Sequence, residues 1–547
     1  MARPRRTVQR AAYAAVALSV SVACGSSRHG ESANRAANAG KTSAGTGGTS
    51  SADAGEAGAG ATLADGGSSR AKGGGGQVAD GGMPSRGGRA GSGAGGAISG
   101  GGTAGAVTMP AGGSVAMAGK AGAETSVPCL ESHDCDRNAH CDRSRGFDEC
   151  VCNADFFGDG MSCDGPRAAT AVSAGYHHTC AIVGSGKVRC WGFAQSGALG
   201  NRNTSQDIGD NDPASASALV DLPQRITEVV AGDQYTCALL TSGDVRCWGR
   251  GEAGQLGIGY AADAVDPATA HDVELGTTAA ALSAGGQHAC ALTTEGAVRC
   301  WGYSGNGELG YGTVELLTPQ TPDIAGDVEL GEPAVSVSAR NESSCAVLAS
   351  GGITCWGRAP GLEENVGDDE TPLEAGVIDI GTGAQSIAVG STHSCALTTA
   401  GNVRCWGQND LGQLGYAIPD PMVAPAKLAE LGDVPLGGEA KQIVVGENFS
   451  CALLTTGAVR CWGYCGAYAY GNCLNVGDLE TPADVGDAPL GGAVASLSAW
   501  WLHVCAVMES GAVRCFGEAE FGALGYGNPY TIGDDETPES VGDVPLF

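Results

Sequence analysis

Basic residues are scarce in this chain, and their scarcity excludes one class of partner. The 547 residues include 30 Lys and Arg against 60 Asp and Glu, which gives a formal net charge of −30 at pH 7. Proteins that bind nucleic acid neutralise phosphates with Lys and Arg, so this balance argues against a nucleic-acid surface.

The N-terminal segment lacks an apolar run long enough to span a membrane. Residues 11–23 are small and apolar but too few to cross a bilayer, and they follow four arginines within residues 1–10. This pattern is typical of an export signal. Ser21-Val22-Ala23-Cys24 resembles the bacterial lipobox, which implies that residues 1–24 are a signal peptide and that Cys24 becomes lipidated. The alternative is cleavage nearby and a free secreted protein.

Residues 25–127 contain almost no large apolar side chains. Such a segment buries too little surface to offset the entropy lost on ordering, so we predict a disordered Gly/Ala/Ser-rich linker. A Gly-rich coil of this length has an r.m.s. end-to-end distance of about 55 Å. We therefore expect a tether that holds the folded part away from its anchor, and a glycine-rich recognition role is the alternative.

Cysteine, in contrast, is abundant and regularly spaced. Cys237 and Cys247 stand ten apart, and Gly243 follows the first of them by six. A three-residue hairpin loop that ends on a glycine in the left-handed region places the two cysteines directly opposite each other. Opposed Cβ atoms are about 4.5–5.5 Å apart, which is close to what a disulfide requires.

The same count applies to seven copies of this stretch, and buried free thiols are the alternative. The predicted disulfides are Cys180–Cys190, Cys237–Cys247, Cys290–Cys300, Cys345–Cys355, Cys395–Cys405, Cys451–Cys461 and Cys505–Cys515. The turn glycines are Gly186, Gly243, Gly296, Gly351, Gly401, Gly457 and Gly511. Cys465 and Cys473 form a further predicted pair within one loop. Disulfides require an oxidising compartment, which agrees with an export signal.

Six more cysteines lie within residues 128–164, a segment too short to have a core of its own. Their spacing allows 15 connectivities. The pattern resembles an epidermal-growth-factor-like module, including Phe157-Gly158-Asp159-Gly160 before the sixth cysteine. The resemblance implies the pairs Cys129–Cys141, Cys135–Cys150 and Cys152–Cys163. Residues 124–128 lack the acidic and amide pattern of the calcium-binding subtype, so no calcium is expected in this module.

Residues 168–547 consist of repeats whose first cysteines recur at intervals of 50–57 residues. A period near 50 with several short strands per unit is typical of a β-propeller. Gly254-Gln255-Leu256-Gly257 and Gly412-Gln413-Leu414-Gly415 resemble the repeat of the regulator-of-chromosome-condensation family, as does a Trp after most second cysteines. These tryptophans are Trp191, Trp248, Trp301, Trp356, Trp406 and Trp462. The resemblance implies an all-β, seven-bladed propeller.

Some repeats depart from this pattern. The seventh has Phe516 in place of Trp, the fourth has Pro360-Gly361-Leu362-Glu363 in place of the G-x-L-G box, and the sixth carries the Cys465/Cys473 insertion. The chain ends on a VGDVPL segment like those that close earlier repeats. We expect this terminal segment to lie beside residues 171–175, so that one blade is built from both ends of the chain and no edge stays open.

Three sets of polar residues are candidate sites. Four histidines stand two before a first cysteine: His178, His288, His393 and His503. A ring of histidines can bind metal, but Tyr235, Ser343 and Phe449 replace them in other repeats, which favours a packing position. Six arginines precede a second cysteine, where inter-blade ion pairing or stacking is expected: Arg189, Arg246, Arg299, Arg404, Arg460 and Arg514.

The third set is four acidic loops, which begin at Gly209, Gly367, Gly477 and Gly533. Their carboxylates offer calcium ligands without the twelve-residue EF-hand pattern, so we expect solvated turns, with calcium binding as the alternative. No other metal and no cofactor is expected.

We predict a non-catalytic interaction module on the cell envelope, anchored to the outer membrane or cell surface through Cys24. Its expected partner is an extracellular or envelope protein or glycan, contacted by the loops after each G-x-L-G box, and the chain is expected to be a monomer. A polysaccharide lyase or hydrolase is one alternative, although no pair of carboxylates is singled out. Guanine-nucleotide exchange follows from the family name alone, and export, disulfides and charge argue against it.

Overall fold

The computed structural model describes residues 139–142, 149–153, 156–158, 163–314 and 321–547. Residues 1–127, including Cys24, lie outside this part of the chain. Within 128–164, β1 (Ala139–Asp142) pairs antiparallel with β2 (Glu149–Cys152), and β3 (Phe156–Gly158) pairs with β4 (Cys163–Pro166). Cys129 and Cys135 are not described, so the three pairs implied for this module stay predictions.

From residue 167 onwards, the described residues form seven antiparallel sheets, one for each repeat. The first three are β5 (Ala169–Ala174), β6 (His178–Val183), β7 (Lys187–Gly192) and β8 (Leu219–Val220); β9 (Ile226–Ala231), β10 (Tyr235–Leu240) and β11 (Val245–Gly249); and β12 (Ala279–Ala284), β13 (His288–Thr293) and β14 (Val298–Gly302).

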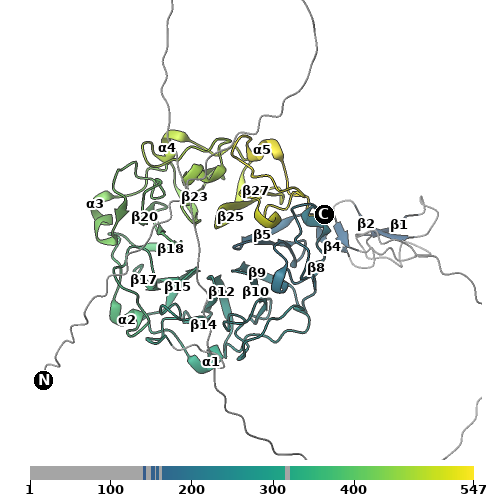
Figure 1. The fold of residues 1–547 in the computed structure, drawn as a ribbon, viewed down its shortest axis with the longest axis horizontal. Coiled ribbons are helices and arrows are strands. Elements are labelled where there is room, and N and C mark those ends of the chain that lie inside the picture. Colours follow the sequence, from purple (N-terminus) through teal and green to yellow (C-terminus); the bar gives the residue numbers. More distant parts are fainter. Residues whose placement is uncertain (1–138, 143–148, 154–155, 159–162, 315–320) are drawn as a thin grey trace, which may run out of the picture. The chain divides into compact units, whose positions relative to one another are not determined.

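The remaining four sheets continue the same order. They are β15 (Ala334–Arg340), β16 (Ser343–Leu348) and β17 (Ile353–Gly357); β18 (Ala384–Val389), β19 (His393–Thr398), β20 (Val403–Gln408) and β21 (Met422–Val423); β22 (Ala440–Val445), β23 (Phe449–Leu454) and β24 (Val459–Gly463); and β25 (Val494–Trp500), β26 (His503–Met508) and β27 (Val513–Gly517). Figure 1 shows the sheets arranged radially around an axis, with the first strand of each sheet innermost. The prediction of a β-propeller is confirmed.

Short helices lie in the segments that connect the sheets. The α-helices are α1 (Pro322–Ala325), α2 (Pro372–Ala375), α3 (Leu428–Leu431), α4 (Pro482–Val485) and α5 (Pro538–Val541), and they lie at the outer edge of the ring (Figure 1). The 3-10 helices are η2 (Gln195–Gly197), η3 (Ala214–Ala216), η4 (Pro425–Lys427), η5 (Tyr464–Tyr468) and η6 (Glu520–Gly522). None of the helices in the described ranges is long and apolar enough to cross a membrane.

Each repeat is built on a disulfide-bridged hairpin. In the second sheet Cys237 lies opposite Cys247, and Gly243 closes the turn with a φ of +87° that favours glycine. The structure brings the two cysteines of each repeat together as a disulfide, with Cα–Cα distances of 4.0–4.1 Å. Cys465 and Cys473 are bonded as well. The prediction that the repeats contain disulfide bonds is confirmed.

The predicted closure of the ring is wrong. The terminal VGDVPL segment does not lie beside residues 171–175, because Val544 donates its N–H to the Val513 carbonyl of β27 (2.7 Å) in its own repeat. Val328 and Val434 make the same bond to Val298 and Val403 in theirs. Each VPL segment is thus the outer edge of the sheet that its own hairpin begins, and every sheet comes from one continuous stretch of chain.

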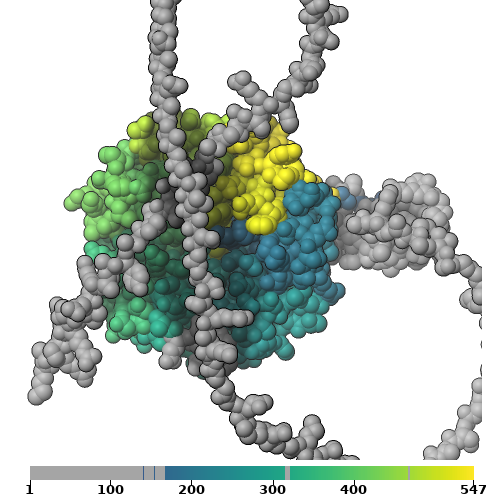
Figure 2. All heavy atoms as spheres, viewed as in Figure 1, coloured from purple at the N-terminus to yellow at the C-terminus, as the bar shows by residue number. Residues whose placement is uncertain are grey.

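The ring closes instead through contacts between complete sheets. The first residue of each inner strand donates its N–H to the carbonyl of the turn glycine in the preceding sheet, as Ala279 does to Gly243 (2.9 Å). The seventh sheet repeats this contact with the first, since Ala169 donates to Gly511 (2.7 Å). The first and last sheets accordingly lie side by side in Figures 1 and 2.

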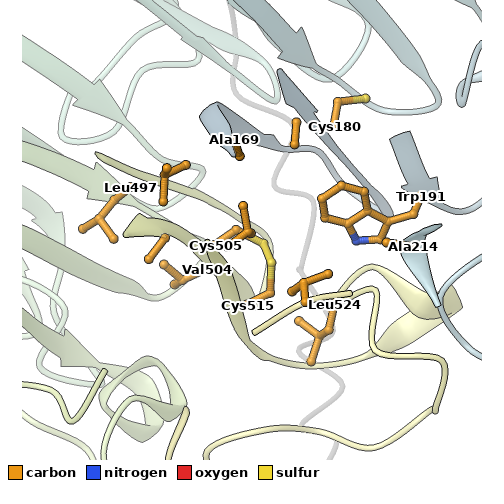
Figure 3. Close-up of a cluster of buried hydrophobic side chains, with 14 of the residues drawn as sticks. Ala169, Cys180, Trp191, Ala214, Leu497, Val504, Cys505, Cys515 and Leu524 are labelled. Carbon is orange, nitrogen blue, oxygen red and sulfur yellow. A yellow bond between two sulfur atoms is a disulfide. The ribbon is translucent and has the colours of Figure 1, made fainter. Parts of the chain in front are cut away.

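Buried side chains fill the space between neighbouring sheets. Figure 3 shows the junction of the last and first sheets, where Trp191 packs beside Leu524 and the Cys505–Cys515 bridge. The Trp191 indole N–H donates to the Ala523 carbonyl of the preceding G-x-L-G box (2.9 Å). Four more tryptophans make the same inter-sheet bond to the box before them: Trp248, Trp301, Trp406 and Trp462.

Two buried tryptophans, Trp406 and Trp356, differ in whether they make this hydrogen bond, which provides a test of its contribution to stability. Trp406 and Trp356 are both fully buried, but Trp406 donates to the Pro360 carbonyl (3.1 Å) whereas the Trp356 indole nitrogen has no partner. We expect Trp406→Phe to destabilise the protein by about 1 kcal/mol more than Trp356→Phe, because only the first change removes a bond and leaves its acceptor unpaired. Denaturant unfolding of the two variants measures the difference. Equal losses of stability would contradict the prediction.

Candidate functional site

A single position of the repeat lines the mouth of the propeller axis. It lies four residues before each first cysteine, in the turn between the innermost strand and its neighbour. We call its seven occupants the ring residues: Tyr176, Asp233, Gly286, Asn341, Ser391, Glu447 and Trp501. All seven line one basin of about 870 Å³.

Loops that carry the G-x-L-G boxes form the wall of this basin. Glu308 belongs to the box of the third repeat, and residues 358–362 cover the departing box of the fourth. Tyr303, Gln408 and Met422 complete the wall. The boxes of the third and fourth repeats and the ring residues therefore line the same basin, and contact by the loops that follow the boxes stays a prediction.

A cation–π contact lies beside the ring residues at the axis. Arg340 and Trp500 stand five before a first cysteine, where the other five repeats have glycine, and the Arg340 Cζ lies 4.0 Å from the Trp500 ring centroid. Arg340 also donates from Nη2 to the carbonyls of Val445 and Ala499, both at 2.8 Å. This one side chain therefore joins the inner strands of the fourth, sixth and seventh sheets. Burial lowers its pKa to about 10, which leaves it charged at neutral pH.

The glycines at this position have a local cause. A Cβ on Gly285 would lie 2.2 Å from the ring of His288, three residues later, and a Cβ on Gly232 would similarly meet Tyr235. In the fourth repeat the small Ser343 stands at that later position, but the seventh repeat combines Trp500 with His503, so the later side chain does not by itself determine this position.

Hydrogen bonds fix the polar side of the basin. Ser391 donates to the Glu447 carboxylate (2.5 Å) and accepts from the Asn341 amide, which joins ring residues of three adjacent sheets. The Thr392 hydroxyl donates to the Glu447 backbone carbonyl (2.7 Å). The Glu447 carboxylate is therefore held in place at the mouth of the axis.

Aromatic side chains form a strip on the opposite side. The Trp501 and Tyr176 rings lie 4.7 Å apart, and His177 packs edge-on against Tyr176 (4.2 Å) and Phe521 (4.6 Å). Phe521 is 41% exposed and contacts Phe193 at 4.9 Å. Burial raises the pKa of Tyr176 and lowers that of His177 to about 4, so both are neutral at pH 7.

Carboxylates outnumber cations around the basin. Asp233, Glu308, Glu342 and Glu447 line it, against Arg358, which lies 3.6 Å from Glu342. Burial raises the pKa of Asp233 and of Glu308, and a neighbouring Arg250 partly offsets the shift for Asp233.

The four candidate histidines belong to the frame of the propeller. His178, His288 and His393 each pair through Nε2 with a Thr or Ser hydroxyl of the next sheet at 2.8 Å, and His503 pairs with Thr179 of the first sheet at 3.1 Å. Burial lowers their pKa values to about 3 for three of them and to about 4 for His288. Within the described ranges, no group of three or more potential metal ligands includes any of them.

The candidate arginines make two kinds of contact. Arg299 pairs through Nε with Asp327 of its own repeat (2.7 Å) and donates from Nη1 to the Leu275 carbonyl of the preceding repeat. Arg404, Arg460 and Arg514 repeat both contacts. The ion pair is thus formed within a repeat, and the inter-blade contact is the hydrogen bond.

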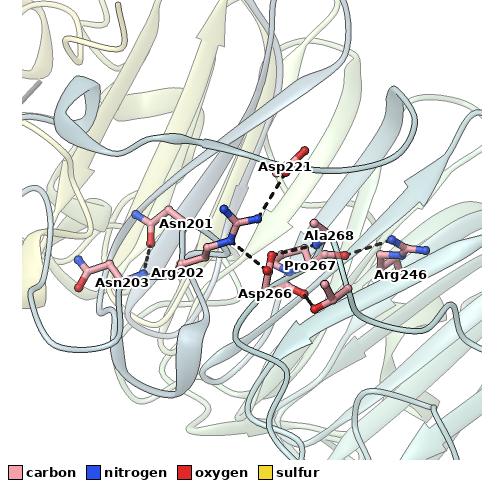
Figure 4. A network of polar contacts seen from close by, with 9 residues as sticks. Asn201, Arg202, Asn203, Asp221, Arg246, Asp266, Pro267 and Ala268 are labelled. Carbon is pink, nitrogen blue, oxygen red and sulfur yellow. Dashed lines mark hydrogen bonds and ion pairs between the residues drawn. The ribbon is translucent and has the colours of Figure 1, made fainter. Parts of the chain in front are cut away.

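Arg246 keeps the ion pair but differs in its second contact. It pairs with Asp272 (2.7 Å) and donates to Pro267 of its own repeat (3.1 Å), beside an ion pair between Arg202 and Asp266 (3.0 Å; Figure 4). Arg189 donates to the Ser215 carbonyl at 2.7 Å. These contacts orient loops at the outer edge of the ring.

Two of the four acidic loops bring their carboxylates together. Asp368, Asp369 and Glu370 form one group in which a single ion can reach all three, and Asp534, Asp535 and Glu536 form the equivalent group. The neighbouring Asp369 raises the pKa of Glu370 to about 7, and burial, followed by Asp535, raises that of Glu536 to about 7. Calcium binding in these loops stays a prediction.

Known proteins resemble most of the propeller. A family model described as RCC1-like domain matches residues 156–472. The chain belongs to the RCC1-like domain family. The ultraviolet-B receptor UVR8 of Arabidopsis thaliana is 29% identical over 368 residues, which cover 66% of this chain and 80% of that protein. The E3 ubiquitin-protein ligase HERC2 of Homo sapiens is 27% identical over 65% of this chain, but this span is 7% of HERC2.

Solved structures show the same fold. The crystal structure of human WBSCR16 superposes with a TM-score of 0.51 at 18% identity and covers 63% of this chain and 91% of that one. At this identity the likeness concerns the fold alone. The RCC1-like family thus accounts for the fold of the propeller.

The four buried histidines are expected to make a contribution to the stability of this RCC1-like propeller that decreases in acid. Their pKa values of about 3–4 lie below the ordinary 6.5, so the unfolded chain binds more protons between these limits and the free energy of unfolding falls as pH falls. Each histidine contributes about 1.4 kcal/mol per pH unit across that window. Carboxylates act in the opposite sense, because the pKa values of Glu228, Glu370 and Glu536 are raised to about 7. The contribution of the histidines is therefore measured by comparing variants.

Thermal unfolding between pH 7 and pH 4 checks this expectation. His393→Gln should flatten the pH dependence relative to the natural protein, whereas His271→Gln, at an exposed position, should leave it unchanged. A pH dependence of His393→Gln identical to that of the natural protein would contradict the assignment of the histidines to the propeller framework.

Proposed function

We propose that this chain is a non-catalytic interaction module that binds an extracellular or envelope partner at the basin face of its propeller. In this proposal the lipidated Cys24 anchors the chain to the cell envelope, and residues 25–127 hold the propeller away from the membrane. Disulfides in all seven hairpins support an oxidising location, because such bonds are rare in reducing compartments.

The observation that supports the proposal is the contrast between two sets of positions: the cysteines and turn glycines are constant, and the ring residues vary. The cysteines and turn glycines keep one identity in every repeat, whereas the ring residues range from Gly286 through Asp233 and Asn341 to Trp501 at equivalent positions. Side chains that served only to close the propeller would have no reason to differ in size and charge while lining one basin. A constant scaffold that presents varied side chains in a concavity is suited to recognition of a specific partner.

The alternative of a polysaccharide lyase or hydrolase rests on Asp233 and Glu308, whose pKa values are raised in one basin. An acid–base pair also needs a positioned base. His288 lines the same basin, but its Nε2 is engaged by Ser344 and three equivalent histidines make the same contact elsewhere. Binding without catalysis therefore accounts for more of the geometry. Guanine-nucleotide exchange has no support beyond the family resemblance.

Removal of the two aromatic ring residues tests the proposal. The variant Tyr176→Ala/Trp501→Ala takes the stacked pair from the mouth of the basin, and large aromatic anchors commonly dominate interface energy. We expect capture of an envelope partner by the full-length exported chain, measured by affinity purification with cross-linking, to fall by at least about tenfold.

A matched control removes aromatic surface elsewhere. Tyr260 and Tyr530 are 49% and 72% exposed and lie outside the basin lining, so Tyr260→Ala/Tyr530→Ala should leave capture unchanged. Both variants should retain the melting temperature of the natural protein to within a few degrees. Cross-links that map to the opposite face, or equal capture by the two double variants, would refute binding at the basin.

A further inference from the structure

We propose that the basin receives a cationic side chain, a Lys or Arg from a basic segment of the protein partner. This inference rests on the proposed function and specifies the chemistry of the recognised group. Three features support it: the charge balance of the lining, one buried carboxylate without a cation, and the aromatic pair at the mouth.

The lining is negative beyond the general acidity of the chain. Four carboxylates face the basin from the second, third, fourth and sixth repeats: Asp233, Glu308, Glu342 and Glu447. The cation in the lining, Arg358, pairs with the exposed Glu342 at the rim. Arg340 donates from Nη2 to backbone carbonyls and also interacts electrostatically with Glu447, and Arg250 interacts in the same way with Asp233. Glu308 has no such cation among the described residues. Carboxylates in one concavity focus the field and attract a cation.

Glu308 is the least compensated of these carboxylates. It is 1% exposed, lines the basin, and accepts hydrogen bonds from the backbone and side-chain amides of Asn306. No ion pair involving Glu308 occurs in the part of the chain that the structure describes, and burial raises its pKa. A buried carboxylate costs free energy unless a cation pairs with it, so its retention points to a partner that supplies the charge.

Two other repeats have an uncharged residue at the position of Glu308. Gln255 and Gln413 occupy the same box position, are fully buried, and accept the same local hydrogen bond from Ala253 and Leu411 at 2.9 Å. Asn306 makes this bond to Glu308 at 2.8 Å. The backbone hydrogen bond therefore does not require a negative charge, although Glu308 also accepts from the Asn306 side chain and the Gln255 Nε2 has no partner.

The shape of the site favours a side chain over a bare metal ion. Within the described residues, the groups of three potential ligands that share one ion lie in the acidic loops and include no basin carboxylate. A Lys or Arg head group with several donors can contact separated carboxylates, and the faces of Trp501 and Tyr176 at the mouth attract a cation. A volume of about 870 Å³ admits such a side chain with its flanking backbone.

The test uses the full-length exported chain and an acetylated, amidated peptide of alternating Lys and Gly. We expect saturable binding by titration calorimetry that weakens with salt, and no binding of the equivalent Gln–Gly peptide. Glu308→Gln should weaken binding about tenfold, since a hydrogen bond to a charged group is lost. The variant should keep the backbone hydrogen bond that Gln255 and Gln413 accept, and its melting temperature is measured alongside to separate lost binding from lost stability.

A control separates the basin from the general acidity of the chain. Glu430→Gln removes one negative charge from an exposed side chain on α3, outside the basin lining, so it should leave binding of the Lys–Gly peptide unchanged. Equal binding by the natural chain and Glu308→Gln, or equal binding of the Gln–Gly peptide, would overturn the inference. Peptide binding tests the inference, and partner capture by Tyr176→Ala/Trp501→Ala tests the proposed function. If capture still fell in that double variant, the proposed function would stand even where the inference failed.

Discussion

The interlock between neighbouring sheets is the interaction on which the rest of the structure depends. The carbonyl of Ala198 in the first repeat accepts both the Thr236 hydroxyl and the Trp248 indole of the second, and Ala523 does the same for Thr179 and Trp191 across the last junction. Each sheet therefore satisfies buried polar groups of the next. A single missing sheet would leave such groups unpaired on both sides, and closure into a ring removes that cost.

Local features of this fold were readable from the sequence because their causes lie within a few residues. The ten-residue spacing of Cys237 and Cys247 with Gly243 between them determines the hairpin register without any other part of the chain. Closure was not readable in the same way. The terminal segment resembles the other VPL segments, and no local signal states whether it pairs with β27 or with β5, because both offer a backbone edge.

The basin could not be predicted from the sequence, for a different reason. Its ring residues stand four before each first cysteine and share no residue type, so a search for motifs passes over them. The signal that identifies them is variation next to a more constant position: the preceding residue is glycine in five of the seven repeats, while the ring position changes in every repeat. Only closure of the ring brings side chains some 50 residues apart in sequence to one concavity.

Charge at Glu308 connects the frame to recognition. The box position must present a carbonyl to the next sheet, and the Glu308 carbonyl does so by accepting the Ser344 hydroxyl (3.1 Å). Its side chain accepts hydrogen bonds from Asn306 but, being almost fully buried, has no cation partner among the described residues. In the proposed binding mode, a cation from the partner offsets the cost of burying this carboxylate. The G-x-L-G box of the third repeat would then serve the fold through its backbone and recognition through its side chain.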